Sequence, residues 1–412
     1  PTRTFSNFDD VFYYEKDLVN VGKVGRRWFG EQFNINNEQE FDFSLPNLDA
    51  SIPINIYINT ASKSFGNTSF SFNVNNQDIG TVNFPALVAF SGIEGYESAI
   101  SRNVNVTSNS INVKLLYSNG GVPSSNGYLD FIRITSKRNL VGYGKQFFFF
   151  NNEEQNNVGI GQYNISNANN VSQIWDVTDL YNVIKYENNS GANFSFKVNL
   201  GTQKKYVAVD VSDAFDPLKE ANSLVQNQNI KGTIFNDNQG NFQDVDYLII
   251  TPQFLVTQAE RLADFHRNNS GLSVRVIALE KIYQEFSSGK QDVAAIRNLV
   301  KYVYWNASTP DKRVKYVNLF GDASYDYKNR IFNNNNIVPI FHGFNPLASD
   351  VNNISNMSLY ASFMSDDFFG LMDNGEGQML GGMDGIDIAV GRMLVSSVSQ
   401  ANEMVDKVVE YH

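Results

Sequence analysis

The chain has 412 residues, of which 42% are hydrophobic and 13% aromatic, and at about 150 residues per domain it is long enough for two or three domains with cores of their own. Its formal net charge of −11 excludes nucleic acid as a partner, because phosphate binding needs a basic surface. No stretch is apolar for long enough to cross a bilayer, and the absence of cysteine excludes disulfides, thiolate metal sites and a cysteine nucleophile within these residues.

The start of the given sequence does not have the pattern of an export signal, so we expect that any such signal has been removed or lies upstream. The chain begins at Pro1 with PTRTFSNF, where no charged region precedes an apolar one. We therefore expect a mature form or a fragment. Asn-rich, Lys-poor loops agree with export from the cell.

Short alternating runs predict an antiparallel β-sandwich for residues 1–140. In SIPINIYINTAS, Ile52, Ile54, Ile56 and Ile58 fall on one face. Pro53 cannot donate to a β-ladder, so this strand starts there or lies at a sheet edge. The runs SFSFNVNN, INVKLLYS and YLDFIRIT repeat the pattern between turn residues.

The run YLDFIRI is apolar at more than every second position. Strict alternation would place Leu129 and Phe131 on one face, and Ile132 and Ile134 on the other. We therefore expect this strand to be covered on both sides.

A second β-rich region is predicted for residues 141–240, where ANFSFKVNL and KKYVAVDVS have strand patterns. The four consecutive phenylalanines from Phe147 to Phe150 need cover, because an exposed patch of that size promotes aggregation. Burial within the fold is the favoured interpretation. Asn and aromatic residues at sandwich edges can also bind sugars, but ordinary turn and core roles are favoured for them.

From residue 241 onward, strands and helices alternate. DVDYLIITP contains a continuous apolar strand, Tyr247 to Ile250, typical of a parallel sheet covered on both faces. QAERLADFHRNNSG has helical spacing, and Gly271 lies where a left-handed helix terminator is expected. LSVRVIAL follows as a second strand, and this β-α-β unit requires a parallel sheet.

The unit repeats along the chain. QDVAAIRNLVKYVYWN predicts a helix capped by Asp292, and RVKYVNLFGD a third strand. A further strand is predicted at Ile386 to Val390, before a helix that Ser399 caps. The apolar stripe of that helix comprises Ala401, Met404, Val405, Val408 and Val409. Residues 241–412 are thus predicted to form an α/β half-domain with a mainly parallel sheet.

Ligands in open α/β sheets bind beyond the carboxyl ends of the strands. Three loops are predicted there: GDASYDYKNR after the third strand, SDDFFGLMDNGEG, and GRMLVSS after the strand ending at Val390. If this chain carries catalytic or ligand-binding residues, these loops are their predicted location.

The segments NLFGDASYD, SDDFFG and DIAVGRMLVSSVSQANEMVDKVVEY occur in this order. In that order they resemble the amino-terminal half of the peptidase domain of gingipain-like cysteine peptidases, and in particular the sortases of the type IX secretion system. The Asn-rich β region before them is similar in kind to the region that precedes the peptidase domain in those sortases.

The resemblance implies a caspase-like fold and a Cys/His dyad in an exported protein at the cell surface, peripheral to the outer membrane. Such a sortase removes carboxy-terminal secretion signals from cargo proteins and transfers the cargo to a lipopolysaccharide amine. The partners implied are the cargo proteins, the outer-membrane barrel PorV with PorZ and PorQ, and the lipopolysaccharide acceptor. The family's dyad lies after the helix on which this chain ends at His412, so we expect the catalytic residues outside this chain and the chain alone to be inactive.

None of the three histidines fits that dyad. His342, in PIFHGFNP, shares the His-Gly pair of the family's dyad histidine but precedes SDDFFG, out of order, so a loop or core role is favoured. His266 follows a helix stripe and is expected to be structural, and His412 is the last residue. Ser324 lacks the G-x-S-x-G elbow of a serine nucleophile.

Acidic residues in the three loops form a candidate metal site. Calcium takes several carboxylate and carbonyl oxygens, so a structural calcium ion is the one cofactor predicted, and solvated turn acids are the alternative. The candidate ligands are Asp322, Asp326, Asp366 and Asp367, with Asp373 and Glu376 nearby. Arg392 is expected to pair with one of these carboxylates and not to bind substrate.

The sequence therefore predicts antiparallel β-sandwich regions followed by the first half of a caspase-like peptidase domain, in a surface sortase. The alternative is a noncatalytic exported adhesion or glycan-binding protein, whose α/β unit is only a scaffold. Latency is a further hypothesis, because β regions ahead of a protease can cover its cleft.

Overall fold

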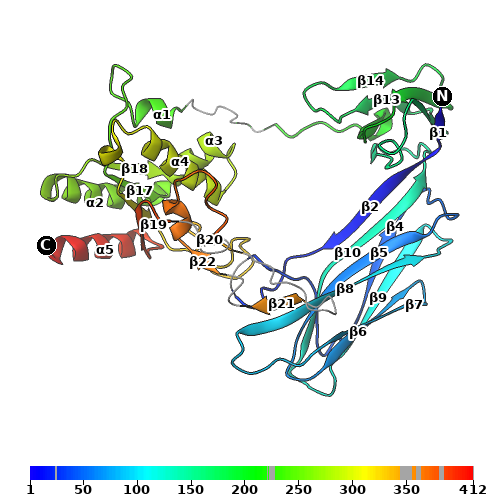
Figure 1. The fold of residues 1–412 in the computed structure, drawn as a ribbon, viewed down its shortest axis with the longest axis horizontal. Helices are drawn as coiled ribbons and strands as arrows, with labels where there is room; N and C mark the ends of the chain where they lie inside the picture. Colours follow the sequence, from blue (N-terminus) through cyan, green and yellow to red (C-terminus); the bar gives the residue numbers. More distant parts are fainter. Residues whose placement is uncertain are drawn as a thin grey trace. The chain divides into compact units, whose positions relative to one another are not determined.

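The computed structural model describes residues 1–23, 26–219, 221, 228–343, 355–358, 363–379 and 385–411. The chain divides into two compact units (Figure 1). Unit 1 comprises Pro1–Val19, Trp28–Ser223 and Ala348–Asn356; unit 2 comprises Asn20–Arg27, Leu224–Leu347 and Met357–His412. The predicted boundaries at residues 140 and 240 stay predictions, because this division does not separate the two β regions of unit 1.

Unit 1 contains the expected antiparallel β-sandwich. One sheet has the strand order β2-β10-β5-β8, with β3 beside β10 and β21 next to β8, and the other has the order β4-β9-β6-β7. The strands are β2 (Asn7–Glu15), β3 (Gln32–Phe33), β4 (Glu38–Ser44), β5 (Ile54–Lys63), β6 (Thr68–Val74), β7 (Gln77–Phe84), β8 (Ile93–Val104), β9 (Ser110–Ser118), β10 (Asn126–Asn139) and β21 (Ser355–Ser358).

The core of this sandwich follows the alternation in the sequence. Ile54, Ile56 and Ile58 are fully buried and pack against aromatic residues of the second sheet, including Phe70 and Phe72. β5 begins directly after Pro53 and lies between β10 and β8. Of the two positions that the proline allowed, the strand start is therefore the right one.

Strand β10 departs from strict alternation. Its pairing with β5 shifts register between Leu129 and Phe131, and this β-bulge turns Leu129 into the core together with Ile132 and Ile134. Phe131 points to the other face, where its ring stacks on Tyr57 at a centroid distance of 5.5 Å. The expected shared face of Leu129 and Phe131 was wrong, because a bulge reverses the alternation after one residue.

The second β region of unit 1 has two further sheets, in the orders β1-β12-β15 and β11-β16-β13-β14. The strands are β1 (Arg3–Phe5), β11 (Phe147–Phe149), β12 (Ile160–Ile165), β13 (Val171–Asp176), β14 (Ile184–Glu187), β15 (Phe194–Asn199) and β16 (Tyr206–Asp210), followed by the 3-10 turn η1 (Val211–Asp213). β1 pairs with β12 in parallel, so the first residues of the chain complete this region before β2 enters the sandwich.

The four phenylalanines are only partly buried. Phe147 and Phe149 lie in the core, whereas Phe148 is 69% exposed. The expected burial therefore holds for alternate residues, because β11 is a strand and adjacent side chains point to opposite faces.

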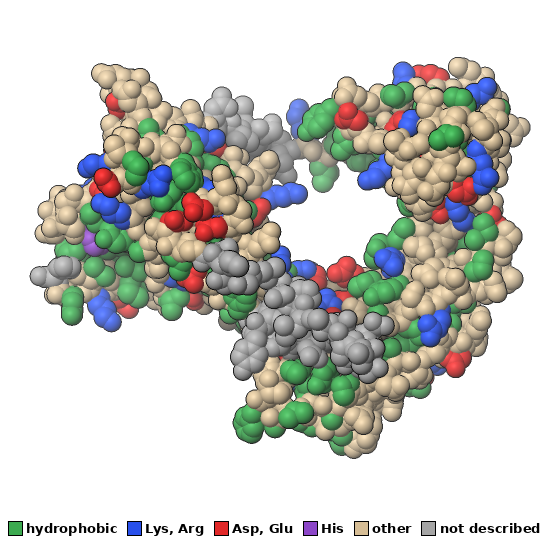
Figure 2. Space-filling model, in the orientation of Figure 1, with side chains coloured by type: hydrophobic (Ala, Val, Ile, Leu, Met, Phe, Trp, Pro, Cys, Tyr) green, Lys and Arg blue, Asp and Glu red, His purple; other side chains and the backbone are tan. Residues whose placement is uncertain are grey.

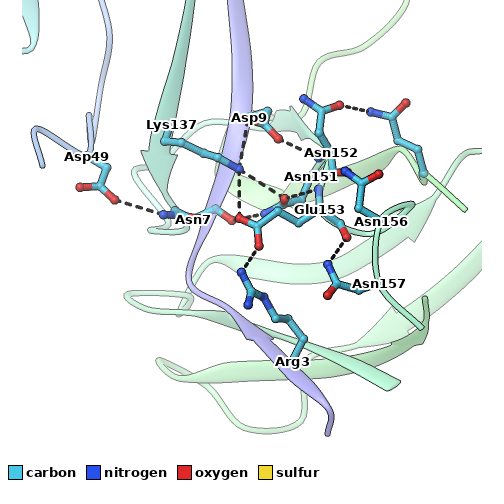
Figure 3. A network of polar contacts seen from close by, with 11 residues as sticks. Arg3, Asn7, Asp9, Asp49, Lys137, Asn151, Asn152, Glu153, Asn156 and Asn157 are labelled. Atoms are coloured by element: carbon cyan, nitrogen blue, oxygen red, sulfur yellow. Dashed lines mark hydrogen bonds and ion pairs between the residues drawn. The ribbon is translucent and has the colours of Figure 1, made fainter. Parts of the chain in front are cut away.

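A polar network joins the two β regions within unit 1 (Figure 3). The Lys137 ammonium lies 3.0 Å from a carboxylate oxygen of Asp9 and donates to the amide oxygen of Asn151 at 3.3 Å. Asp9 also accepts from the backbone N–H of Asn152 at 2.7 Å, and Arg3 pairs with Glu153. Lys137 and Arg3 thus place positive charges beside the carboxylates of Asp9 and Glu153 at this junction.

Unit 2 is built around a parallel sheet in the order β18-β17-β19-β23. The strands are β17 (Tyr247–Thr251), β18 (Val274–Ala278), β19 (Tyr316–Phe320) and β23 (Ala389–Met393). The helices are α1 (Ile230–Thr233), α2 (Val256–Asn269), α3 (Leu279–Phe286), α4 (Val293–Trp305) and α5 (Val398–Tyr411). The predicted β-α-β succession and the fold class are confirmed.

Helices cover both faces of this sheet. Ile249 packs in one layer with residues of α2 and α5, such as Leu262 and Val405. Its neighbours Leu248 and Ile250 pack in the other layer, with residues of α3 and α4. The continuous apolar run of β17 follows from this double cover. Gly271, after α2, has φ +65°, the left-handed conformation expected at the helix end.

Short elements complete unit 2. They are the two-stranded pair β20 (Phe341–His342) and β22 (Met364–Ser365), and the 3-10 turns η2 (Gln253–Leu255), η3 (Pro310–Lys312) and η4 (Asp367–Gly370). They lie between the main strands and helices, and β20, β22 and η4 belong to the segment from β19 to β23.

Three local predictions differ from the structure. β23 begins at Ala389 and not at Ile386, because Asp387 instead donates to the Gly370 carbonyl and accepts from the Met372 N–H. Helix α3 follows β18 without a loop and was not predicted. Helix α5 begins at Val398, so Ser399 lies inside it.

The cap of α5 is Ser397. Its hydroxyl accepts from the backbone N–H of Gln400 at 3.3 Å, and the Gln400 side chain accepts in return from the backbone N–H of Ser396. Along the predicted stripe, Ala401 and Val405 are buried, whereas Val409 is 42% exposed.

Candidate functional site

Charge alone does not mark a site on this protein. On the face drawn in Figure 2, acidic and basic side chains are interspersed over both units. The site must therefore be located from the topology of the parallel sheet, whose carboxyl ends are Thr251, Ala278, Phe320 and Met393.

Arg392 lies at this edge, as the second-last residue of β23. Its guanidinium makes a bidentate ion pair with Asp366, at 2.8 Å from Nε and 2.6 Å from Nη2. Nη1 donates to the carbonyls of Gly321 and Val338, at 2.8 and 2.6 Å, and Nη2 to that of Pro339 at 3.4 Å. The side chain is 8% exposed. The expected pairing of Arg392 with a loop carboxylate is present, with Asp366 as the partner.

Asp326 organises the loop after β19. It is fully buried, and its Oδ2 accepts from the backbone N–H groups of Arg330 and Ile331 at 2.5 and 2.6 Å. Asn334 donates to the Asp326 carbonyl, and the Ser324 hydroxyl accepts from the Asp326 N–H at 3.0 Å. Ser324 thus acts here as a turn residue.

The other candidate acids have separate partners. The Asp322 carboxylate accepts from the adjacent Ala323 N–H, and the backbone N–H of Asp367 donates to Ser365. The Glu376 carboxylate accepts from the N–H groups of Asp373 and Gly385.

The four predicted ligands are therefore not brought together around one point by these contacts. In the part of the chain that the structure describes, no group of three or more His, Cys, Asp or Glu side chains is placed to hold a metal ion. The structural calcium ion stays a prediction.

His342 lies in β20 and is 6% exposed. It lines a cavity of about 210 Å³, together with Tyr327, Asp292 and Arg26. The Tyr327 ring centroid is 5.2 Å from that of His342, and Asp292 caps the start of α4 through its 2.8 Å contact with the Ala294 N–H. This cavity lies beside Pro339, whose carbonyl Arg392 binds. Sequence reasoning missed it, because its walls come from distant segments.

His266 lies elsewhere in unit 2. It lines a hollow of about 640 Å³ with Tyr247, Asn318 and Gly391. Asn318 donates to the Tyr247 hydroxyl at 3.0 Å, and burial raises the pKa of Tyr247. The His266 ring centroid lies 5.3 Å from that of Tyr247, the first residue of β17, so His266 lies toward the amino-end side of the sheet, although the same hollow extends along β23 to Arg392 and Met393. His412 is outside the described residues.

Two further contacts fix the carboxyl-end loops and were also missed. The Thr251 hydroxyl donates to the Phe320 carbonyl at 2.9 Å, which joins the ends of β17 and β19. The Glu280 carboxylate accepts from the Gln253 N–H at 2.9 Å. A polar residue at the end of an apolar strand, as in LIIT, is a signal that could have indicated the first of these contacts.

None of the described helices is long and apolar enough to span a membrane.

Comparison with known proteins places this geometry in a wider context. Residues 241–412 match Peptidase family C25, and no curated protein matches the chain. The crystal structure of dimeric latent PorU from Porphyromonas gingivalis is similar over 99% of this chain and 38% of that chain, with 23% identity and a TM-score of 0.79. This chain thus spans little more than a third of the PorU chain.

Carbohydrate-binding modules match smaller parts of the chain. One is the C-terminal CBM6 of LamC from Zobellia galactanivorans, with 19% identity over 31% of this chain and all of that module, and a TM-score of 0.20. That score is too low to indicate a shared fold for the chain. The chain resembles PorU: it has the fold of part of that protein along nearly its whole length, and its residues 241–412 match Peptidase family C25.

Proposed function

We propose that this chain is the amino-terminal portion of a type IX secretion sortase. The complete protein cleaves carboxy-terminal secretion signals from cargo proteins and attaches the cargo to lipopolysaccharide. The observation that carries the proposal is the match of residues 241–412 to Peptidase family C25 within a chain that follows the PorU fold over 99% of its length.

The parallel sheet of unit 2 supports this proposal. Its strands end together at an edge where Arg392, the Gly321 carbonyl and the segment before β20 are held by hydrogen bonds. Ligand sites in open α/β sheets are built at such an edge. The sequence holds no cysteine, so the proposal places the Cys/His dyad outside these 412 residues.

The proposed chemistry is acyl transfer through a thioester. The cysteine thiolate attacks the scissile carbonyl of the cargo, a C–S bond forms, and the C–N bond to the signal peptide breaks as its nitrogen takes a proton from the histidine. An amine of the acceptor then attacks the thioester, an amide forms, and the thiolate leaves. The attacking amine gives up its proton to the histidine.

Partners and location belong to the same proposal. The substrates are secreted cargo proteins with carboxy-terminal signals, and the acceptor is lipopolysaccharide. The outer-membrane barrel PorV, with PorZ and PorQ, is the proposed assembly at the cell surface.

A cleavage assay on the longer protein that contains these residues tests the proposal. We expect a cargo protein with its carboxy-terminal signal to be shortened, and thiol alkylation to abolish the reaction. Residues 1–412 alone, assayed as the control, should show no turnover. Turnover that survives alkylation would exclude the cysteine mechanism, and absence of turnover in the longer protein would favour the noncatalytic adhesion alternative.

A further inference from the structure

Arg392 uses its donors on three separate segments of unit 2. They are Gly321 directly after β19, Val338 and Pro339 shortly before β20, and Asp366 directly after β22. β20 and β22 pair as two short antiparallel strands (Figure 1). A guanidinium is planar and carries five N–H donors in a fixed arrangement, so one side chain can set the positions of all three segments at once.

These contacts anchor the small β20-β22 pair to the main sheet. Phe341 pairs with Ser365, and His342 with Met364. Val338 and Pro339 precede β20 in the chain, and Asp366 follows β22. Arg392 therefore binds the segment before the first strand of the pair and the residue after the second. The Phe341 ring also stacks on the buried ring of Phe368 in the core of unit 2, at a centroid distance of 4.4 Å.

Through β20 and the two residues before it, the anchored pair forms a wall of the cavity of about 210 Å³ at the start of α4. Pro339, Ile340, Phe341 and His342 all line it. A shift of β20 relative to the sheet would therefore change the shape of this cavity and the position of His342. A lysine at residue 392 keeps the charge but cannot make the bidentate pair and the carbonyl contacts together.

We infer that Arg392 and Asp366 are positioning residues for the peptidase reaction: they hold the carboxyl-end loops and the β20-β22 wall in one arrangement. This inference rests on the proposed function. Neither residue touches the reacting bond. Their role is to keep the cavity wall at β20 fixed relative to the carboxyl ends of the parallel strands.

The buried position explains why this pair is suited to positioning. The Arg392 side chain is 8% exposed, whereas that of Arg261, which pairs with Asp406 between α2 and α5, is 45% exposed. An exposed pair is screened by water and holds its partners weakly. Arg261→Lys is therefore a matched control in the same unit.

The test compares Arg392→Lys with Arg261→Lys in two measurements. The first is backbone hydrogen exchange of residues 1–412, read over residues 321–343 and 363–371. We expect faster exchange there for Arg392→Lys alone. The second is kcat and KM of the longer protein, where displacement of a positioned surface lowers kcat by roughly tenfold to a hundredfold, with a smaller change in KM. Arg261→Lys should leave both measurements unchanged.

A merely structural role would lower the melting temperature but leave kcat per folded molecule unchanged, and that result would overturn the inference. Asp366→Glu is a second variant in case Arg392→Lys fails to fold. The longer side chain keeps the ion pair with Arg392 but displaces β22 by about the length of one methylene group. We expect kcat to fall in this variant too. Wild-type kcat and exchange in both variants would overturn the inference.

Failure of the proposed function gives a different pattern. If the wild-type longer protein has no peptidase activity, the sortase proposal fails, and local exchange still reports whether Arg392 holds the three segments. Unchanged exchange would then reject the positioning role as well.

Discussion

The two units fill their cores with different proportions of aromatic rings. Branched aliphatic residues make up most of both cores, but the sandwich core of unit 1 holds a larger group of rings, including Phe33, Phe70, Phe72 and Tyr117, than the main core of unit 2. In the sandwich, two sheets face each other across one layer about 10 Å thick, which large rings can span. In unit 2 the sheet has a layer on each face, and smaller side chains fill both.

Phe70→Ala should cause the largest loss of stability in this comparison. The ring is fully buried and contacts Phe33 and Tyr117 at centroid distances of 5.0 and 4.9 Å. Its removal leaves a cavity that strands cannot close, and we expect a cost of about 3–5 kcal/mol. Urea unfolding with pulsed hydrogen exchange, which assigns each transition to one unit, should show the shift in unit 1. Phe148→Ala, at an exposed position, is the control and should change little.

Leu299→Ala is the matching change in unit 2. This residue of α4 is fully buried between helix and sheet. We expect a loss of about 2–4 kcal/mol, smaller than for Phe70 because fewer atoms are removed, and confined to the unit 2 transition in the same experiment. An equal shift of both transitions would show that the units unfold together.

Glu154→Gln should change how the stability of unit 1 depends on pH. Glu154 is fully buried beside the Tyr206 hydroxyl, which donates to it at 2.7 Å. Burial raises the pKa of its carboxyl above the ordinary value of 4.5. The folded state therefore holds the proton to higher pH than the unfolded state, and stability falls as pH rises from about 4.5 through the folded pKa.

The measurement is the free energy of unfolding of unit 1 as a function of pH, from about pH 4 to about pH 8, because the Glu154 carboxyl is expected to ionise within this range. The Glu154 carboxylate also accepts from the backbone N–H of Lys204 at 2.9 Å. Glutamine cannot ionise and can keep both hydrogen bonds, because its amide oxygen can accept from the Lys204 N–H and its NH₂ group can donate to the Tyr206 hydroxyl. The decrease with pH should be weaker in the variant. Equal slopes in both proteins would exclude Glu154 as the cause.

The smallest expected effect concerns the cap of α5. Ser397→Ala removes the hydroxyl that accepts from the Gln400 N–H and should cost about 1 kcal/mol. Ser399→Ala, inside the helix, should be neutral or slightly stabilising, because alanine favours helix. Thermal unfolding of unit 2 compares the two. A larger loss at Ser399 would show that the helix begins later.

Sequence patterns predicted the strands and helices of both units well wherever a single hydrophobic periodicity, that of a strand or of a helix, continued without interruption. Examples are Ile54, Ile56 and Ile58 on one face of β5 and the continuous apolar run Leu248 to Ile250 in β17. The patterns failed where a local exception intervened. The bulge at Leu129 shifted the alternation by one residue, and α3 was missed because it starts directly after the last residue of β18, without a turn signal.

The candidate site was predicted in part. The loops that follow the strands were located correctly, and Arg392 was expected to pair with a loop acid. That Asp366 is this acid, and that three carbonyls share the guanidinium, did not follow from the sequence. The carbonyls belong to the backbone, which has no signature in residue type. The spacing of Asp322, Asp326 and Asp367 in the sequence likewise did not indicate that each has hydrogen-bond partners of its own.

The sequence by itself determined the order of strands and helices in this protein and the faces that they bury, because hydrophobic periodicity is a local property of consecutive residues. Only the tertiary structure decided the register of β23, the cavity beside His342 and the partners of Arg392, one of which is 71 residues away along the chain. Such contacts depend on which segments, far apart in the sequence, come to lie side by side, and a local pattern of residues does not indicate which segments meet.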